Sequence, residues 1–418
     1  MEIRRDDYLN QLTAKEHNGL IKIVTGVRRC GKSYLLFRLF RKHLLEQGVP
    51  EDHIIEIVLD DRRNKRLRDP DVCLDYVISR TSGEGSYYVL LDEVQLMPEF
   101  EDVLNTFLHM DNVDVYVTGS NSRFLSSDIA TQFRGRGDEI RVYPLSFREF
   151  LSSGMYSSRT EAWNQYYTYG GMPFILQLSR EEDKAAYLQR LFEETYLRDI
   201  VERHHIRNDA QMEELVDLIA SSVGSLTSVN KLANTFQSRE RAELSAPTVK
   251  QYLNYLEEAF LVEKAVRYDI RGKKHIGAPC KYYFSDVGLR NARLNFRQQE
   301  ENHIMENIIY NELRIRGYSV DVGMVELSEK DASGRNSRKQ TEVDFVANRG
   351  SRRYYIQSAW QLPTEEKREK EERPLIHIPD SFRKILVVRD DTMLKRDDRG
   401  IVTMGILEFL SDRNSLDL

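Results

Sequence analysis

Residues 26–33 have the sequence Gly26-Val27-Arg28-Arg29-Cys30-Gly31-Lys32-Ser33, which fits the pattern G-x-x-x-x-G-K-[ST] at every position. A loop of this kind wraps backbone N–H groups around phosphate oxygens, because its glycines let the chain approach a ligand closely. We expect the Lys32 ammonium to reach the outer phosphates and the Ser33 hydroxyl to be a ligand of Mg²⁺. The predicted nucleotide-binding segment is this loop together with Tyr34, which follows it.

The residues on either side of the loop predict a strand before it and a helix after it. Residues 21–24 read Ile-Lys-Ile-Val, which is typical of a short strand. From Ser33 to Leu45, leucine and phenylalanine recur at helical spacing, and Gly48 follows where such a helix would end. This strand–loop–helix context favours a phosphate-binding loop over a glycine turn that merely caps a helix.

Three further apolar runs, at 54–59, 87–91 and 113–118, predict strands that alternate with helices. Nearly unbroken apolar strands of this kind predict an α/β fold with a parallel sheet that is covered on both faces. Ligands of such sheets bind beyond the carboxyl ends of the strands. The phosphate loop and the polar residues after positions 91 and 118 would therefore share one edge.

An acidic pair, Asp92-Glu93, ends the run at 87–91, and we place it at the tip of the strand beside the phosphate loop. Asp92 would hold Mg²⁺ through its water shell, and Glu93 would polarise the water that attacks the γ-phosphate. Ser120 and Asn121 would hydrogen-bond the γ-phosphate or this water. The alternative for Ser120 and Asn121 is a polar turn that binds its own backbone.

Two arginines, Arg134 and Arg136, flank a glycine shortly afterwards. One of them would project towards the nucleotide of a neighbouring subunit and stabilise the charge that develops during hydrolysis. The alternative is a surface turn with ordinary salt bridges. In the first case the active site is shared, and the working form is a homo-oligomer.

The overall composition excludes several classes of protein. The chain has 418 residues, which predicts about three domains. Its net charge of −6 argues against non-specific coating of nucleic acid, so any basic binding face must be local. The scattered cysteines Cys30, Cys73 and Cys280 show no metal spacing and predict a reducing, cytoplasmic location. No apolar run approaches the ~20 residues of a membrane helix, so we expect no membrane partner.

Seven motifs carry a resemblance to a known family. They are residues 26–33, Val-Leu-Leu-Asp-Glu-Val-Gln at 89–95, Thr-Gly-Ser-Asn at 118–121, Arg-Gly-Arg at 134–136, Tyr-Pro-Leu-Ser-Phe-Arg-Glu-Phe at 143–150, Tyr-Gly-Gly-Met-Pro at 169–173 and Phe-Ser-Asp-Val-Gly-Leu at 284–289. Together they resemble the AAA+ ATPases, and in particular a sparsely characterised bacterial and archaeal family with a C-terminal region of unknown function. The resemblance implies ATP as the nucleotide, an AAA+ core at 1–145 and a helical lid at 146–223.

Residues 224–299 have the rhythm of a winged helix-turn-helix. Ser228 can cap one helix, Pro247 lies near the start of a second, and a hairpin would run from about 261 to 284. If this module binds DNA, the second helix would face the groove and the cationic hairpin tip would contact phosphate. The groove residues would be Thr248, Lys250, Gln251 and Asn254, and the tip residues Arg271, Lys273, Lys274 and His275. A protein–protein or interdomain role is the alternative.

Residues 300–418 resemble the restriction-endonuclease-like fold. That resemblance assigns its acidic positions to Glu306 and Asp344, places Gln357 on the third strand, and puts Ala359 where the catalytic lysine belongs. Losing the lysine and one carboxylate should cripple hydrolysis, so we expect a degenerate nuclease domain used for binding or for oligomer contacts. The alternative for Asp344 and Glu342 is that they are surface acids close to a turn. The polar segment 328–339 is predicted to be an exposed loop.

These observations favour a Mg²⁺-dependent AAA+ ATPase that couples ATP hydrolysis to DNA or to a DNA-bound protein partner. A first alternative is a slow nucleotide-gated switch that acts through protein contacts without DNA. A second alternative is a nuclease that cleaves DNA with its last domain. The sequence names neither the pathway nor the partner.

Overall fold

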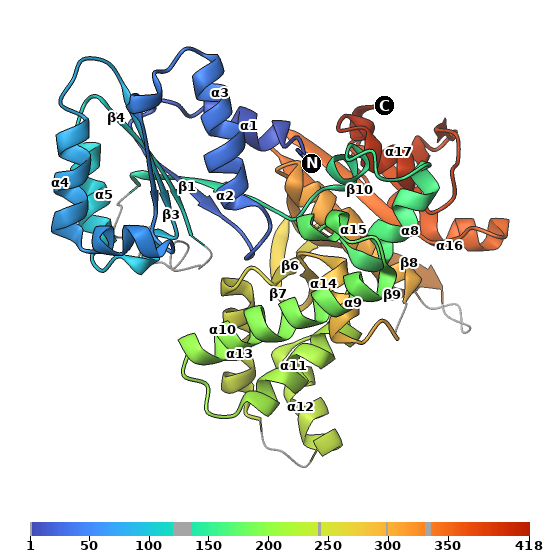
Figure 1. The fold of residues 1–418 in the computed structure, drawn as a ribbon. Coiled ribbons are helices and arrows are strands. Elements are labelled where there is room, and N and C mark those ends of the chain that lie inside the picture. The colour runs from blue at the N-terminus through green and yellow to red at the C-terminus, as the bar shows by residue number, and fades with distance from the viewer. Residues whose placement is uncertain (1, 120–134, 241–243, 298–299, 331–335) are drawn as a thin grey trace. The chain divides into compact units, whose positions relative to one another are not determined.

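The computed structural model describes residues 2–119, 135–240, 244–297, 300–330 and 336–418 (Figure 1). The chain divides into two compact units, Met1–Pro144 with Glu258–Phe260, and Leu145–Glu257 with Leu261–Leu418. The boundaries expected near 223 and 299 both lie inside the second unit. Among the described residues, no helix combines the length and the apolar character needed to cross a membrane.

A parallel sheet forms the centre of the first unit. In the described residues its strand order is β2-β3-β4-β1-β5, and every neighbouring pair is parallel. The strands are β1 (Ile21–Thr25), β2 (Ile54–Val58), β3 (Tyr87–Asp92), β4 (Val113–Thr118) and β5 (Gly137–Arg141). The predicted parallel sheet is confirmed. The sequence did not predict β5, because only Ile140 is buried in this otherwise polar edge strand.

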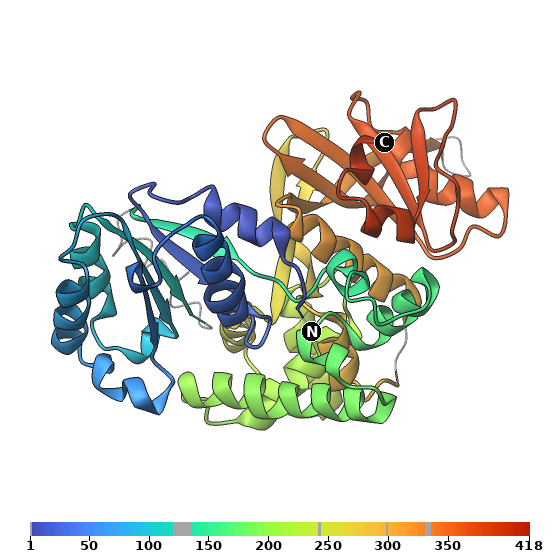
Figure 2. The ribbon, with the colours of Figure 1, turned by 45° about the horizontal axis from the view of Figure 1, so that its top comes forward.

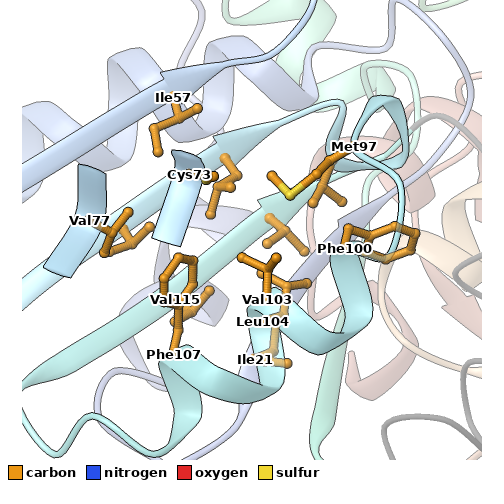
Figure 3. Close-up of a cluster of buried hydrophobic side chains, with 14 of the residues drawn as sticks. Ile21, Ile57, Cys73, Val77, Met97, Phe100, Val103, Leu104, Phe107 and Val115 are labelled. Carbon is orange, nitrogen blue, oxygen red and sulfur yellow. The ribbon is translucent and has the colours of Figure 1, made fainter. Parts of the chain in front are cut away.

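Helices cover both faces of this sheet, with α4 and α5 on one face and α1, α2 and α3 on the other (Figures 1 and 2). The helices are α1 (Asp6–Thr13), α2 (Lys32–Tyr34), the π-helical η1 (Leu35–Phe40), α3 (Arg41–Glu46), α4 (Pro70–Arg80) and α5 (Phe100–Leu108). Short 3₁₀ turns are η2 (Glu51–His53), η3 (Arg62–Arg68) and η4 (Val94–Leu96). The sandwich is held by buried apolar side chains between the sheet and α4 and α5, as Figure 3 shows for Val77, Phe107 and Val115.

A mixed sheet dominates the second unit. In the described residues its strand order is β12-β13-β11-β10-β9-β8-β6-β7. The strands are β6 (Val262–Asp269), β7 (Lys274–Phe284), β8 (Ser319–Lys330), β9 (Asn336–Arg349), β10 (Arg352–Ala359), β11 (Arg383–Val388), β12 (Lys395–Arg396) and β13 (Ile401–Gly405). Strand β6 pairs antiparallel with β7 and parallel with β8. The hairpin expected in a winged helix is therefore part of the same sheet as the C-terminal strands.

The remaining elements of the second unit are helical. The helices are α7 (Phe147–Leu151), α8 (Arg159–Tyr169), α9 (Glu181–Arg190), the π-helical η7 (Leu191–Leu197), α10 (Arg198–Arg203), α11 (Asp209–Ser221), α12 (Val229–Glu240), α13 (Ala246–Glu258), α14 (Val287–Arg293), α15 (Glu301–Ile315), α16 (Glu365–Ile376) and α17 (Ile406–Ser411), with 3₁₀ turns η6 (Pro173–Gln177) and η8 (Ser415–Asp417). The Ser228 hydroxyl accepts a hydrogen bond from Lys231 N–H at 3.2 Å, which confirms the predicted cap of α12.

Two of the seven motifs meet in this unit. Asp286 caps α14 by accepting from Leu289 N–H at 3.1 Å, and it also accepts from Gly171 N–H at 2.7 Å. A Cβ on Gly288 would lie only 2.0 Å from the carbonyl oxygen of Tyr169. The motifs at 169–173 and 284–289 therefore serve close packing of α8 against α14, and burial raises the pKa of Asp286 to about 6.

The predicted exposed loop at 328–339 is wrong over most of its length. Strands β8 and β9 pair as far as Lys330 and Asn336, and residues 331–335 lie outside the described part of the chain. A hairpin of this kind is held by its backbone ladder. Its strands therefore need no run of apolar residues, and for that reason the polar sequence did not predict them.

Candidate functional site

The phosphate loop lies at the carboxyl end of β1, as predicted. A Cβ on Gly26 would lie 2.0 Å from the carbonyl oxygen of Val142, and Gly26 has a φ of 138° that other residues rarely adopt. Gly31 has a φ of 103° and precedes α2 as its N-cap. Both glycines are thus required by the backbone, which leaves the loop N–H groups at a helix N-terminus where phosphate binds well.

The side chain of Lys32 folds back and bonds the start of its own loop. Its side chain is buried, and Nζ donates to the carbonyl oxygens of Gly26 at 3.0 Å and Val27 at 3.1 Å. These carbonyls hold the ammonium at the loop. A phosphate would offer the same ammonium a charged acceptor, and a charge-assisted hydrogen bond is stronger than one to a carbonyl.

Ser33 and Asp92 are in contact, as their predicted shared role requires. Ser33 Oγ donates to Asp92 Oδ1 at 2.9 Å, and Thr118 Oγ1 donates to the same carboxylate oxygen. Burial raises the pKa of Asp92, while the hydrogen bonds from Thr118 and Ser33 oppose that shift. A hydroxyl and a buried carboxylate are hard oxygen donors of the kind that Mg²⁺ prefers, so this pair fits the predicted ion.

The acidic pair is not on the strand next to the loop, and this part of the prediction is wrong. Strand β4 lies between β1 and β3, and Thr118 at the end of β4 contacts Asp92. The same hydroxyl accepts from the N–H of Glu93 at 3.1 Å. Thr118 therefore orients both acids, a role that the sequence analysis did not predict.

Glu93 lies in a left-handed turn with φ 51° and is only partly buried. Its carboxylate accepts a hydrogen bond from the side-chain amide of Gln95. The predicted general base is thus held by a neighbouring amide, within the motif at 89–95. A strained conformation of this kind is common at functional sites.

The other predicted nucleotide-binding residues occupy different environments. Val27 and Cys30 are buried, Arg28 is half-buried and Arg29 is exposed. The side chain of Tyr34 lines a separate cavity of about 450 Å³ formed with η1 and α3, to which no residue of 26–33 contributes.

Arg136 lies beside the amino end of β1, whereas the phosphate loop of the same chain follows the carboxyl end of that strand. The carbonyl of Arg136 accepts from Ile21 N–H at 2.9 Å, at the first residue of β1, whereas the loop follows Thr25 at the other end. At ~3.3 Å per strand residue, the two ends are separated by about 15 Å. This placement disfavours a role in its own subunit. Asn121 and Arg134 lie outside the described residues.

A buried arginine that the sequence analysis missed braces the loop from behind. Arg5 donates from Nη1 to the carbonyl of Cys30 at 2.9 Å and from Nη2 to the carbonyl of Tyr143 at 2.8 Å. Its guanidinium lies 4.5 Å from the ring centroid of Tyr8. No local pattern signals this role, because the partners are 25 and 138 residues away.

The positions expected from the nuclease resemblance come together in the second unit. Glu306, Asp344 and Gln357 line one cavity of about 480 Å³, together with Ala359. Asp344 is buried, so the alternative of a surface acid is wrong. Burial and the charge of Glu306 raise the pKa of Asp344 well above its usual range. Among the described residues, no group of three His, Cys, Asp or Glu has the arrangement of a metal site.

Comparison with protein families assigns two segments of the chain to different families. Residues 18–151 match a family described as an AAA domain, and residues 160–300 match a domain of unknown function. The first match contains the phosphate loop, the acidic pair Asp92-Glu93 and both predicted arginines.

Related proteins span most of the chain. An uncharacterized protein of Haemophilus influenzae is 33% identical over 390 residues, which cover 92% of this chain and 93% of the relative. An uncharacterized protein of Methanocaldococcus jannaschii is 29% identical over 355 residues, covering 82% and 75%. The solved structure of Aeropyrum pernix ORC1 in complex with DNA aligns with a TM-score of 0.32 and 14% identity over 73% of this chain and 94% of that one. A score this low carries no functional argument.

Proposed function

This chain belongs to an AAA+ family in which an AAA domain precedes a domain of unknown function, and from that premise we propose that it binds and hydrolyses ATP with Mg²⁺. The observation that carries the proposal is the 2.9 Å contact between Ser33 Oγ and Asp92 Oδ1 beside a closed phosphate loop. This contact joins the two predicted magnesium ligands, which are 59 positions apart in the chain.

Each residue of the site then has a defined task. The N–H groups of 27–33 and the ammonium of Lys32 bind the phosphates, and Ser33 and Asp92 would hold Mg²⁺, which when bound neutralises phosphate charge. Glu93 accepts a proton from the attacking water once its carboxylate leaves Gln95. The hydroxyl of Thr118 fixes the Asp92 carboxylate and the backbone of Glu93 through hydrogen bonds.

We propose that Arg136 acts on the nucleotide of a neighbouring subunit, which makes the working form a homo-oligomer. Its position beside the amino end of β1 supports this assignment. Asn121 and Arg134 retain their predicted roles at the γ-phosphate and as the alternative arginine. Mixing Arg136→Ala subunits with Lys32→Ala subunits tests the proposal, since shared sites would restore part of the turnover that each variant lacks alone.

We propose that ATP hydrolysis is coupled to DNA or to a DNA-bound protein. Arg271 and Lys273 are exposed in the turn after β6, and Lys274 is exposed at the start of β7. Lys250 and Gln251 are exposed on α13. Changing Lys273 and Lys274 together to alanine should weaken DNA binding at low salt and reduce its salt dependence. Changing Lys370, which is exposed on α16, is the matched control. A chain that binds no DNA would refute coupling to DNA and leave the ATPase proposal intact.

A slow nucleotide-gated switch that acts through protein contacts is the second candidate, and one observation favours it. The carboxylate of Glu93 is engaged by Gln95, so the base must be released before each turnover. Under this candidate, Gln95→Ala should raise the steady-state turnover of ATP, and DNA should have no effect on it.

Steady-state ATP turnover, with and without DNA, tests the proposal. Glu93→Gln should bind ATP with little change in affinity and lower turnover at least ~100-fold, the usual effect of losing a general base. Glu99→Gln, at an exposed residue of the same segment, is the matched control and should change neither quantity. Unchanged turnover in Glu93→Gln would remove Glu93 from the mechanism, and a chain without affinity for any nucleotide would refute the whole proposal.

A further inference from the structure

A buried lysine lies among the acids of the second unit. Lys281, on β7, is 2% exposed. Its Nζ donates to Glu306 Oε1 at 2.7 Å and lies 2.5 Å from Glu342 Oε1 and 3.7 Å from Asp344 Oδ1. Three carboxylates therefore each turn one oxygen towards a single ammonium.

The acids are held in place by more than the lysine. Asp344 on β9 accepts from the N–H of Ser358 at 2.8 Å through its other oxygen. Glu306 on α15 also accepts from the hydroxyl of Tyr283, which is the second residue after Lys281 on β7. The oxygens thus converge because of the fold, and convergent carboxylate oxygens are what a hard divalent cation binds.

The strand on which the nuclease resemblance expects a lysine supplies no cation. Ala359 on β10 is 4% exposed and packs in an apolar cluster with Tyr355, Leu375 and Val388. The ammonium instead enters from β7, which is the strand at the end of the sheet next to β6. The positive charge at the cavity therefore comes from a residue 78 positions before Ala359.

We propose that Lys281 is the resident cation of this cavity, where it takes the place of a divalent metal and fastens the β6–β7 hairpin to α15 and β9. Moving a divalent ion to the convergent oxygens would require the ammonium to leave, and a buried ammonium without its carboxylates is strongly disfavoured. The wild-type cavity accordingly excludes metal, and the sheet that contains it does not hydrolyse phosphodiesters.

Binding of Mn²⁺ to the full nucleotide-free chain tests this proposal, measured by electron paramagnetic resonance. Lys281→Met removes the ammonium from between the three acids and should gain one Mn²⁺ site per chain that wild type lacks. The gain should disappear in Lys281→Met/Asp344→Asn. Lys264→Met is the matched control, because Lys264 is exposed on the neighbouring strand β6 and should gain nothing. A folded Lys281→Met chain that gains no site would overturn the proposal.

A second comparison needs no change at Lys281 and so does not depend on how that variant folds. Wild type and Asp344→Asn should bind the same number of Mn²⁺ ions, because the cavity holds none in either. A site that is present in wild type and lost in Asp344→Asn would overturn the proposal. Cleavage of DNA by wild type with Mg²⁺ or Mn²⁺ that Asp344→Asn abolishes would overturn it too. The outcome is independent of ATP turnover, since Lys32 and Asp92 are unchanged throughout.

Discussion

Arg5 provides the sharpest test of how the phosphate loop is held in shape. The guanidinium bonds the carbonyls of Cys30 and Tyr143 at 2.9 and 2.8 Å, and the side chain is 2% exposed. Arg5→Lys keeps the charge, but a single ammonium does not reproduce the planar fork that serves both carbonyls. One of the two hydrogen bonds from Arg5 is then lost.

The cost follows from these contacts. A hydrogen bond to a charged group contributes about 1.5–3 kcal/mol, and an orphaned buried acceptor costs about 1–3 kcal/mol. We therefore expect Arg5→Lys to lower the free energy of unfolding of the first unit by about 2 kcal/mol, and Arg5→Met by about 4 kcal/mol, since it removes the hydrogen bonds to both carbonyls. Urea unfolding of the full chain measures both values.

The same variants should weaken ATP binding more than turnover at saturating ATP. A loosened loop must be reordered by the ligand, and each 1.4 kcal/mol of reordering lowers affinity about tenfold. Arg4→Met is the control, because the neighbouring side chain of Arg4 is 78% exposed. If Arg5→Met unfolds at the same urea concentration as wild type, or binds ATP equally well, the bracing role is refuted.

Three further predictions concern the packing of the second unit and the order of the first site. Gly288→Ala should destabilise the chain by about 3 kcal/mol, because its Cβ would meet the carbonyl of Tyr169, whereas Gly277→Ala, with open space around it, should be nearly neutral in urea unfolding. Burial raises the pKa of Asp286 to about 6 from 3.8, so the native state binds its proton more tightly. The stability of wild type relative to Asp286→Asn should then fall by about 2.4 kcal/mol as pH rises from 4 to 7, and a pH-independent difference would contradict the shift. Thr118→Val should lower turnover at least ~10-fold with a smaller effect on ATP affinity, because it releases Asp92 and Glu93, and equal losses in turnover and affinity would argue against orientation.

The phosphate loop could be predicted because its chemistry is local. Eight consecutive residues carry the glycines, the ammonium and the hydroxyl, and the backbone of Gly26 and Gly31 confirms why those positions are glycine. Asp92 was also within reach, because a strand that ends in acids is recognisable from its own residues. The order of the strands in the sheet does not follow from the residues of any one strand. The position of β4 between β1 and β3 was therefore missed.

Contacts between distant segments were beyond the sequence analysis. Arg5 is one of two arginines in a charged N-terminal segment, and only the fold distinguishes it from exposed Arg4. Lys281 precedes two tyrosines in an apolar strand, which is an unusual place for an ammonium. That position could have suggested a buried ion pair, but not its partners, because Glu306 and Asp344 follow on other elements.

The two sites of this chain differ in the partners of their buried lysine. That difference explains why the AAA+ resemblance predicts a ligand site, whereas the nuclease resemblance does not. At the first site Lys32 bonds neutral carbonyls, so its charge remains available to a phosphate. At the second site Lys281 bonds carboxylates, so its charge is already neutralised within the fold. A motif reports which groups are present, whereas the partners of each ammonium decide whether a ligand is still needed. The first site thus has the electrostatics of a binding site, and the second has those of a structural junction between β7, α15 and β9.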